Sequence, residues 1–157
     1  MEYYIEKISE EVFPIKIINC GKEVYSIFYY NDQEDDCLIR NKENIIGFKN
    51  LKDVEKFCDT EHIFMSLEPY IYNFDIKICD VINCDDILVN WNLLNTISLL
   101  FGMHFEGNER KYDSIYDFLF YSSMSEAKVR RINNNQKKKL QRVFKQKNRL
   151  LGKIILC

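Results

Sequence analysis

Two histidines and six cysteines are the residues of this 157-residue chain whose side chains could most readily do chemistry. Neither His62 nor His104 lies in a nucleophile motif such as G-x-S-x-G, so neither is predicted to act as a catalytic base. We expect surface or packed imidazoles instead. No catalytic constellation emerges, and the chain is predicted not to be an enzyme.

Cysteine and histidine also bind zinc. Cys58 and His62 are four residues apart, which would place them on one face of a helix, and Cys79 and Cys84 could complete a site of three thiolates and one imidazole. The spacing between Cys79 and Cys84 is at the loose end of the usual range, however, and these cysteines alternate with apolar residues. Small buried thiols explain them better, so we predict no metal site.

Glycine usage argues against nucleotide chemistry. The chain has five glycines, and none falls in G-x-G-x-x-G or G-x-x-x-x-G-K, the loops that cradle phosphates. The sequence pattern therefore does not favour an ordinary kinase, GTPase or dehydrogenase. No cofactor is expected.

The composition indicates one compact domain over residues 1–157. Its content of hydrophobic residues, 46%, is far from that of a disordered chain. No export signal opens the sequence, and no apolar run is long enough to span a bilayer. We expect a soluble cytoplasmic protein with reduced thiols and no membrane partner.

The charge is divided sharply along the chain. From Met124 onward eleven Lys or Arg residues stand against one acid, Glu126, whereas the preceding part has a net charge of −12. If the acids gather on one side, they form a surface for a basic protein partner. The acids predicted to bind that partner are Asp32, Glu34, Asp35, Asp36, Asp75 and Asp80.

The basic segment 128–153 supports a second hypothesis, a small nucleic-acid-binding or regulatory protein. Its cations, with Phe144 among them, suit phosphate binding. The acidic remainder of the chain would repel the same polyanion. Nucleic acid is therefore the weaker choice of partner, and a solvated helix face remains an alternative.

The elements that must position these residues follow from the hydrophobic pattern. Residues 1–48 read as a β-rich part, with strands at 3–9, 13–20, 23–31, 37–40 and 44–48, a turn at Gly21 and Lys22, and a bulge at Gly47. Residues 50–157 read as helix-rich. We predict an α+β fold in which an antiparallel N-terminal sheet packs against a C-terminal helical layer.

The helical part begins with a segment capped by Asn50. The stretch 63–83 is ambiguous, because Pro69 interrupts any helix. Further helices are predicted from a cap at Asp85 to a stop at Gly102, over 112–123, and over 137–151, while residues 153–157 could pair with the sheet. In the helix that ends at Gly102, the amide of Asn90 is expected to be buried and hydrogen-bonded.

Several short motifs resemble the immunity proteins of bacterial contact-dependent growth inhibition systems. "DDILVNWNLLNTISLLFGMHFEG" contains Trp91-Asn92-Leu93, and "YDSIYDFLFYSS" contains Ile115-Tyr116-Asp117-Phe118-Leu119-Phe120, with "IIGFKNLKDVEKFCD" before them. The resemblance covers residues 44–123. The chain lacks the later G-N-N-L and P-x-W-x-x-E stretches of that family.

The resemblance implies a non-enzymatic cytoplasmic protein that binds the C-terminal domain of a cognate toxin, commonly a nuclease, and blocks it by occlusion. It also implies that the family motif forms scaffold and not an active site. The residues expected in that structural core are Asn90, Trp91, Asn92, Tyr116 and Phe120.

Overall fold

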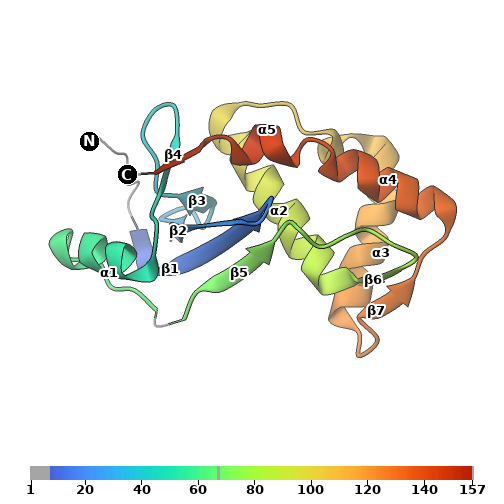
Figure 1. Cartoon of the computed structure of the whole chain (residues 1–157), viewed down its shortest axis with the longest axis horizontal. Coiled ribbons are helices and arrows are strands. Elements are labelled where there is room, and N and C mark those ends of the chain that lie inside the picture. The colour runs from blue at the N-terminus through green and yellow to red at the C-terminus, as the bar shows by residue number, and fades with distance from the viewer. Residues whose placement is uncertain (1–7, 67, 157) are drawn as a thin grey trace. The chain divides into compact units, whose positions relative to one another are not determined.

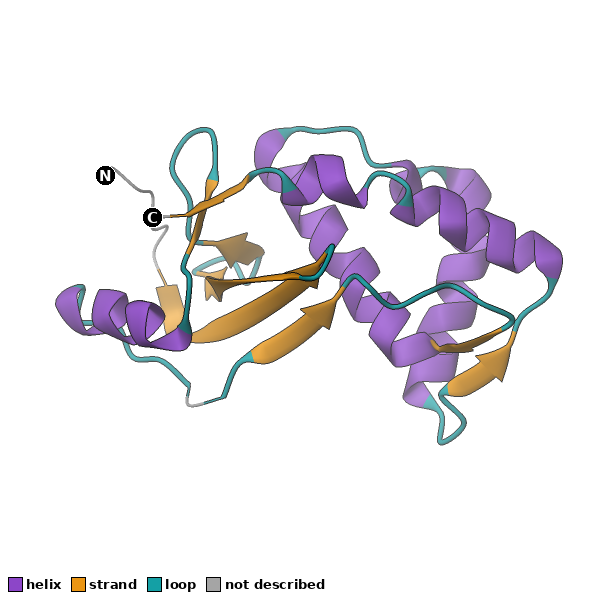
Figure 2. Cartoon of the chain, viewed as in Figure 1, coloured by secondary structure: helices purple, strands orange, loops and turns teal. Residues whose placement is uncertain are grey.

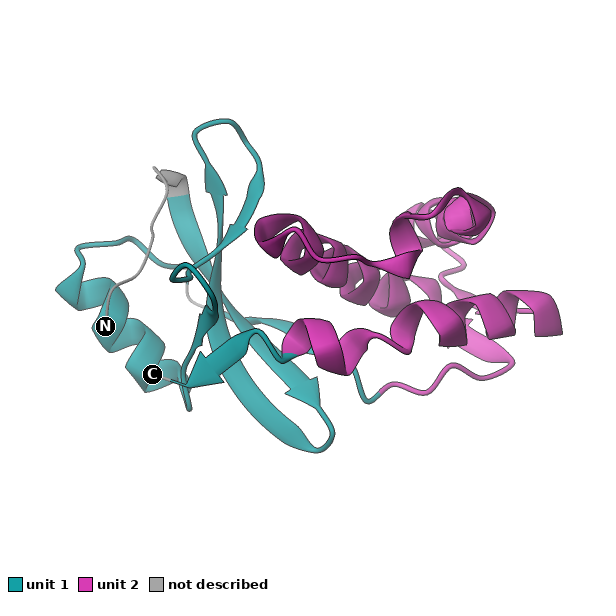
Figure 3. Ribbon diagram, turned by 90° about the horizontal axis from the view of Figure 1, so that it is seen from above, with its two compact units in different colours: residues 1–75, 152–157 teal, residues 76–151 magenta. Residues whose placement is uncertain are grey.

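The computed structural model describes residues 8–66 and 68–156. It has the predicted α+β composition of strands and helices (Figures 1 and 2). The chain divides into two compact units (Figure 3): unit 1 comprises residues 1–75 and 152–157, and unit 2 comprises residues 76–151. A single domain with its sheet packed against the helices stays a prediction.

Unit 1 is built on a four-stranded sheet with the order β3-β2-β1-β5. β1 (Ile8–Asn19) and β2 (Lys22–Asn31) form an antiparallel hairpin, and β3 (Asp36–Leu38) lies antiparallel to β2. The expected strand at 3–9 falls mostly outside the described residues.

The stretch 63–83, which the sequence left open, contributes the fourth strand of this sheet. β5 (Tyr70–Asn73) pairs with β1 in parallel, directly after Pro69. Proline is tolerated immediately before an edge strand because its missing N–H removes no ladder bond. The sheet is therefore mixed, which corrects the prediction of a purely antiparallel sheet.

A second, two-stranded sheet joins distant parts of unit 1. β4 (Ile45–Gly47) pairs in parallel with β8 (Ile154–Leu156). The C-terminal segment thus forms a strand as expected, but it pairs with β4 in a separate sheet and not with the four-stranded sheet. A Cβ added at Gly47 would lie 2.8 Å from methyl carbons of both Ile154 and Val24. Gly47 thus permits close packing, whereas the sequence pattern had suggested a bulge.

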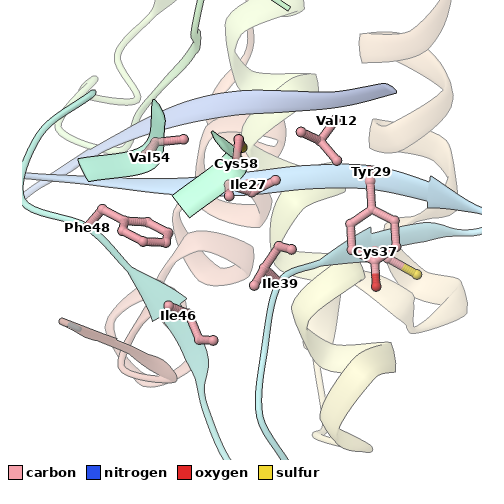
Figure 4. Packing of buried hydrophobic residues seen from close by; sticks show 9 residues of the cluster. All are labelled: Val12, Ile27, Tyr29, Cys37, Ile39, Ile46, Phe48, Val54 and Cys58. Atoms are coloured by element: carbon pink, nitrogen blue, oxygen red, sulfur yellow. The ribbon is translucent and has the colours of Figure 1, made fainter. Parts of the chain in front are cut away.

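The core of unit 1 lies between one face of the sheet and helix α1 (Leu51–Thr60). Asn50 caps this helix as predicted, because its side chain accepts a hydrogen bond from the N–H of Asp53 at 2.9 Å. Val54 and Cys58, one turn apart, are its buried residues. Figure 4 shows the cluster: Val12, Ile27, Tyr29, Cys37, Ile39, Ile46, Phe48, Val54 and Cys58.

Unit 2 consists mainly of helices. The expected stop at Gly102 is confirmed, since this residue adopts a left-handed conformation at the end of α2. The expected cap is corrected from Asp85 to Asn83, whose side chain accepts bonds from the N–H groups of Asp85 and Asp86. The helices are α2 (Cys84–Phe101), α3 (Asp113–Met124), α4 (Asn134–Phe144) and α5 (Lys147–Leu151).

Two features of unit 2 differ from the expectation. The single helix predicted over 137–151 is divided into α4 and α5, and α4 begins earlier because Asn133 and Gln136 form a capping box. A short antiparallel pair, β6 (Val81–Asn83) and β7 (Val129–Arg131), was not predicted. Three-residue strands are too short to show a recognisable period.

Candidate functional site

The acidic loop, residues 32–36, connects β2 to β3 and is held in place by Asn31. The Oδ1 atom of Asn31 accepts hydrogen bonds from the N–H groups of Gln33 and Asp35, both at 2.9 Å. The backbone N–H of Asn31 also donates to the carbonyl of Asp35 at 3.1 Å. Asn31 itself is only 7% exposed. The buried Asn31 side chain thus holds the backbone of the loop in an Asx-type turn, and the side chains of the loop acids remain exposed to solvent.

The carboxylates of the acidic loop face solvent. Asp32, Glu34 and Asp35 are exposed, and they form no ion pair with any residue of the described part of the chain. Glu34 has a φ of 64°, a left-handed conformation that a residue other than glycine adopts at a cost of roughly 1–2 kcal/mol. The loop therefore concentrates negative charge on a tight turn.

Asp36, the fourth acid of the loop, lies at the start of β3 directly opposite Tyr30 of β2. Because opposite residues of an antiparallel pair point to the same face, the Asp36 carboxylate stands beside the Tyr30 ring. Burial raises the pKa of Tyr30, and the charges of Asp36 and Tyr70 raise it further. Burial, with Asp36 again contributing, raises the pKa of Tyr72 to about 12.

Asp75 binds the turn of the β1–β2 hairpin and does not belong to the acidic loop. Its two carboxylate oxygens accept hydrogen bonds from the backbone N–H groups of Cys20, at 2.6 Å, and Gly21, at 2.9 Å. Both residues have positive φ, as a two-residue turn between twisted strands requires. The turn therefore lies at Cys20 and Gly21, one residue earlier than predicted.

Asp80, the last of the six predicted acids, belongs to unit 2. Its Oδ1 atom lies 2.8 Å from the Nζ atom of Lys137 on α4. The hydrogen bond from Lys137 lowers the pKa of Asp80, and the same bond raises the pKa of Lys137. The structure thus brings four of the predicted acids together in one loop, and gives Asp75 and Asp80 intramolecular partners.

The motif of the family resemblance forms the aromatic centre of unit 2. Trp91 is 2% exposed, and its ring meets those of Tyr116, Phe105 and Phe144 at centroid distances of 5.3, 6.4 and 6.4 Å. Asn90, beside it in sequence, is buried as well.

The neighbouring residues of this motif lie nearer the surface. The Tyr116 hydroxyl donates to Oδ1 of Asn92 at 2.9 Å, which ties α3 to α2 at an exposed position. Phe120 is 42% exposed, contrary to the expectation that it belongs to the core. Its position on α3 explains this, because Ile115, Leu119 and Ser122 form the buried face of that helix.

The histidines and cysteines do not assemble into a reactive centre in the described residues. His62 is exposed, and Nε2 of His104 lies 3.6 Å from Oε1 of Glu109 at the surface. Cys58 is a core residue of unit 1, where burial and the charge of Asp59 raise its pKa to about 11. Within residues 8–66 and 68–156 no group of three or more metal-binding side chains occurs.

The basic segment is partly engaged within unit 2. Besides the Lys137 pair, Nε of Arg142 lies 3.3 Å from Oε2 of Glu106, and Arg149 donates to the carbonyl oxygen of His104. Lys128, Lys138 and Lys145 are exposed. Some cations of the basic segment thus form contacts within unit 2, and other cations remain exposed.

The described helices include none that is long and apolar enough to cross a membrane.

Two parts of the site escaped sequence reasoning. Asn31 was not predicted to organise the loop, although an asparagine at the start of an acidic turn is a typical Asx-turn signal. Tyr30, the exposed tyrosine opposite Asp36, was also missed. Its signal was the alternation in β2, where Phe28 and Tyr30 alternate with the core residues Ile27 and Tyr29.

The chain was compared with family models, curated proteins and solved structures. No protein-family model matches the chain, and no curated protein matches it. Among solved structures, the chain is similar to the SatS C-terminal domain, crystallised in complex with bromine, with a TM-score of 0.62 and 11% sequence identity. The match covers 93% of this chain and 94% of that one. At this level of identity the likeness concerns the fold alone, which is of the α+β class.

Proposed function

We propose that this chain is a non-enzymatic immunity protein that binds the C-terminal domain of a cognate toxin in the cytoplasm and neutralises it by occlusion. The observation that carries the proposal is the acidic loop, in which the exposed carboxylates of Asp32, Glu34 and Asp35 have no ion-pair partner among the described residues. A nuclease toxin holds its polyanionic substrate with Lys and Arg, and these carboxylates complement such a surface.

Additional support comes from the rigidity of the loop and from the family resemblance. Asn31 preorganises the backbone, so little conformational entropy is lost when a partner binds. The W-N-L motif that carries the resemblance is used as scaffold around Trp91. Cysteines 20, 37, 58, 79 and 84 are present as thiols, which fits a reducing compartment.

Nucleic-acid binding through residues 128–153 is the second function that the sequence suggested. The ion pairs of Lys137 and Arg142 within unit 2 reduce the number of cations that this segment offers to phosphates. We therefore favour the immunity function over it.

The test is co-expression with the cognate toxin domain, which the proposal expects to be encoded beside this gene. The wild-type protein should protect the cells and co-purify with the toxin. The triple variant Asp32→Asn, Glu34→Gln, Asp35→Asn should lose protection while it remains folded by circular dichroism.

A matched control removes the same charge elsewhere in unit 1. Glu55, Asp59 and Glu61 are exposed acids on α1 or at its end. The variant Glu55→Gln, Asp59→Asn, Glu61→Gln should protect as well as the wild type. Equal loss in both variants would mean that net charge and not the loop matters, and undiminished protection by the loop variant would exclude the loop as the binding site.

A further inference from the structure

The sheet of unit 1 carries aromatic side chains on the face opposite its core cluster. On β2, Ile27 and Tyr29 belong to the core, so Phe28 and Tyr30 point to the other side. On β1, Phe13 lies opposite Phe28 and therefore points to the same side. On β5, Tyr70 and Tyr72 pair with Ile15 and Ile17 of β1 and also point to this side. We call this set the tyrosine face: Phe13, Phe28, Tyr30, Tyr70 and Tyr72.

The tyrosine face is partly covered and reaches solvent mainly at Tyr30 and Tyr70. On the same side of the sheet, Ile15, Ile17 and Leu38 are only 1–2% exposed. Tyr30 meets Phe28 at a centroid distance of 5.3 Å and Phe13 at 6.2 Å, both edge to face. Tyr30 is nevertheless 42% exposed, and Tyr70 is 65% exposed. Large aromatic surfaces held rigidly and left exposed are typical anchors of protein interfaces, because tyrosine loses little rotamer freedom on binding.

The tyrosine face borders the acidic loop through Asp36. Asp36 lies opposite Tyr30 in the register, and its charge contributes to the raised pKa values of both Tyr30 and Tyr72. Asp36 is itself exposed, as are the three acids that precede it in the loop. Aromatic surface and carboxylates are therefore presented side by side within one unit.

We infer that the tyrosine face and Asp36 bind an arginine-bearing segment of a protein partner. A guanidinium group is planar, stacks on aromatic rings and offers a fork of N–H donors to a carboxylate, whereas the ammonium group of lysine is compact and more strongly hydrated. Charge complementarity with the acidic loop selects a basic segment, and the exposed rings select arginine within it. The inference rests on the proposed function for the partner's identity.

Peptides test this inference without the toxin. The probes are a fluorescently labelled glycine–arginine repeat peptide and a glycine–lysine repeat peptide of equal length, titrated with the full-length protein. The wild type should bind the arginine peptide about two- to fivefold more tightly, the ratio that an exposed cation–π contact provides. The variant Tyr30→Leu, Tyr70→Leu should bind both peptides equally.

Two further variants separate recognition from folding. Tyr30→Phe, Tyr70→Phe keeps both rings and should keep the arginine preference. Phe120→Leu, Tyr121→Leu removes two rings of similar exposure, 42% and 69%, from unit 2, and should keep it too. Equal binding of both peptides by the wild type would overturn the inference, as would a preference that survives in the Tyr30→Leu, Tyr70→Leu variant or disappears in the unit 2 control.

The outcome is separable from that of the protection assay. If the protein prefers the arginine peptide but does not protect cells from the toxin, the inference about the tyrosine face is supported and the proposed immunity function is refuted. Protection without arginine preference would overturn the inference and leave the immunity function in place.

Discussion

The acidic loop of unit 1 and helix α4 of unit 2 carry opposite charges and use them differently. On α4, Lys137 and Arg142 each lie within ion-pair distance of an acid of the same unit. In the loop, Asp32, Glu34 and Asp35 have no such partner among the described residues. The net charge of a segment alone therefore does not identify a binding surface, and the local pairing of its charges is the more informative property.

The same contrast holds for the two aromatic groups. In unit 2 three aromatic rings pack against the buried Trp91, whereas Tyr30 and Tyr70 of unit 1 are exposed. A buried ring stabilises the fold, and an exposed, rigid ring is available to a partner. Mutations in the two regions should accordingly separate stability from binding.

The largest expected effect is that of Trp91→Ala. Removing a fully buried indole that contacts three other rings should lower the free energy of unfolding by about 3–5 kcal/mol. Urea denaturation followed by circular dichroism measures it. A loss below about 1 kcal/mol would mean that this cluster is not the stabilising centre of unit 2.

Tyr72→Phe tests the environment of the tyrosine face through its pH dependence. The folded pKa is about 12, against the ordinary 10.0, so above pH 10 the unfolded chain loses this proton first and stability falls. A difference of this size corresponds to about 2 kcal/mol between pH 10 and pH 12. In chemical denaturation, the unfolding free energy of the variant should fall less steeply between pH 10 and pH 12 than that of the wild type. Identical pH dependence in the two proteins would mean that the Tyr72 hydroxyl is solvated in the folded protein.

Asn31→Ala should weaken the acidic loop. It removes the acceptor of two backbone N–H groups, which costs about 1–2 kcal/mol in unfolding free energy and loosens the loop. Toxin affinity should fall although no charge is lost. Hydrogen exchange of the Gln33 and Asp35 amides should accelerate, and unchanged exchange would show that other contacts hold the loop.

The variant Glu34→Gly provides the comparison for Asn31→Ala. It removes one charge while it suits the left-handed backbone at this position. We expect unchanged or slightly raised thermal stability together with weaker toxin binding. A lower melting temperature would indicate that the Glu34 side chain contributes to the fold.

The smallest effect is expected for Lys137→Met. Asp80 and Lys137 form an exposed pair, so the melting temperature should hardly change, and toxin binding should not change. Carboxyl NMR should show the pKa of Asp80 rising towards its ordinary value, because the hydrogen bond that lowers it is gone. A large loss of toxin affinity would move the binding surface to unit 2.

Local sequence signals predicted those parts of the fold that local chemistry determines. Asn50 and Gly102 are the clearest cases, because a cap and a left-handed stop depend on adjacent backbone only. The α+β class followed from the change of hydrophobic period after residue 48.

Features that depend on partners distant in sequence were not predictable. The parallel pairing of β5 with β1 and the role of Asp75 at a turn more than fifty residues away have no local signature. Four acids within five residues could be expected to share a surface, but the ion pair of Asp80 with Lys137 could not be foreseen from spacing. The motif of the resemblance indicated Trp91 correctly as core, and Asn92 and Phe120 incorrectly, since both are exposed and adjacent residues on a helix differ in direction by about 100°.

The most direct test of the central claim is the salt dependence of toxin binding. The affinity of the wild-type protein for the toxin domain should fall by about tenfold or more from low to high ionic strength, because the exposed loop carboxylates are screened. The Asp32→Asn, Glu34→Gln, Asp35→Asn variant should bind weakly with a nearly flat dependence. Parallel salt dependence in the two proteins would contradict the account, since the loop would then contribute no charge to the complex.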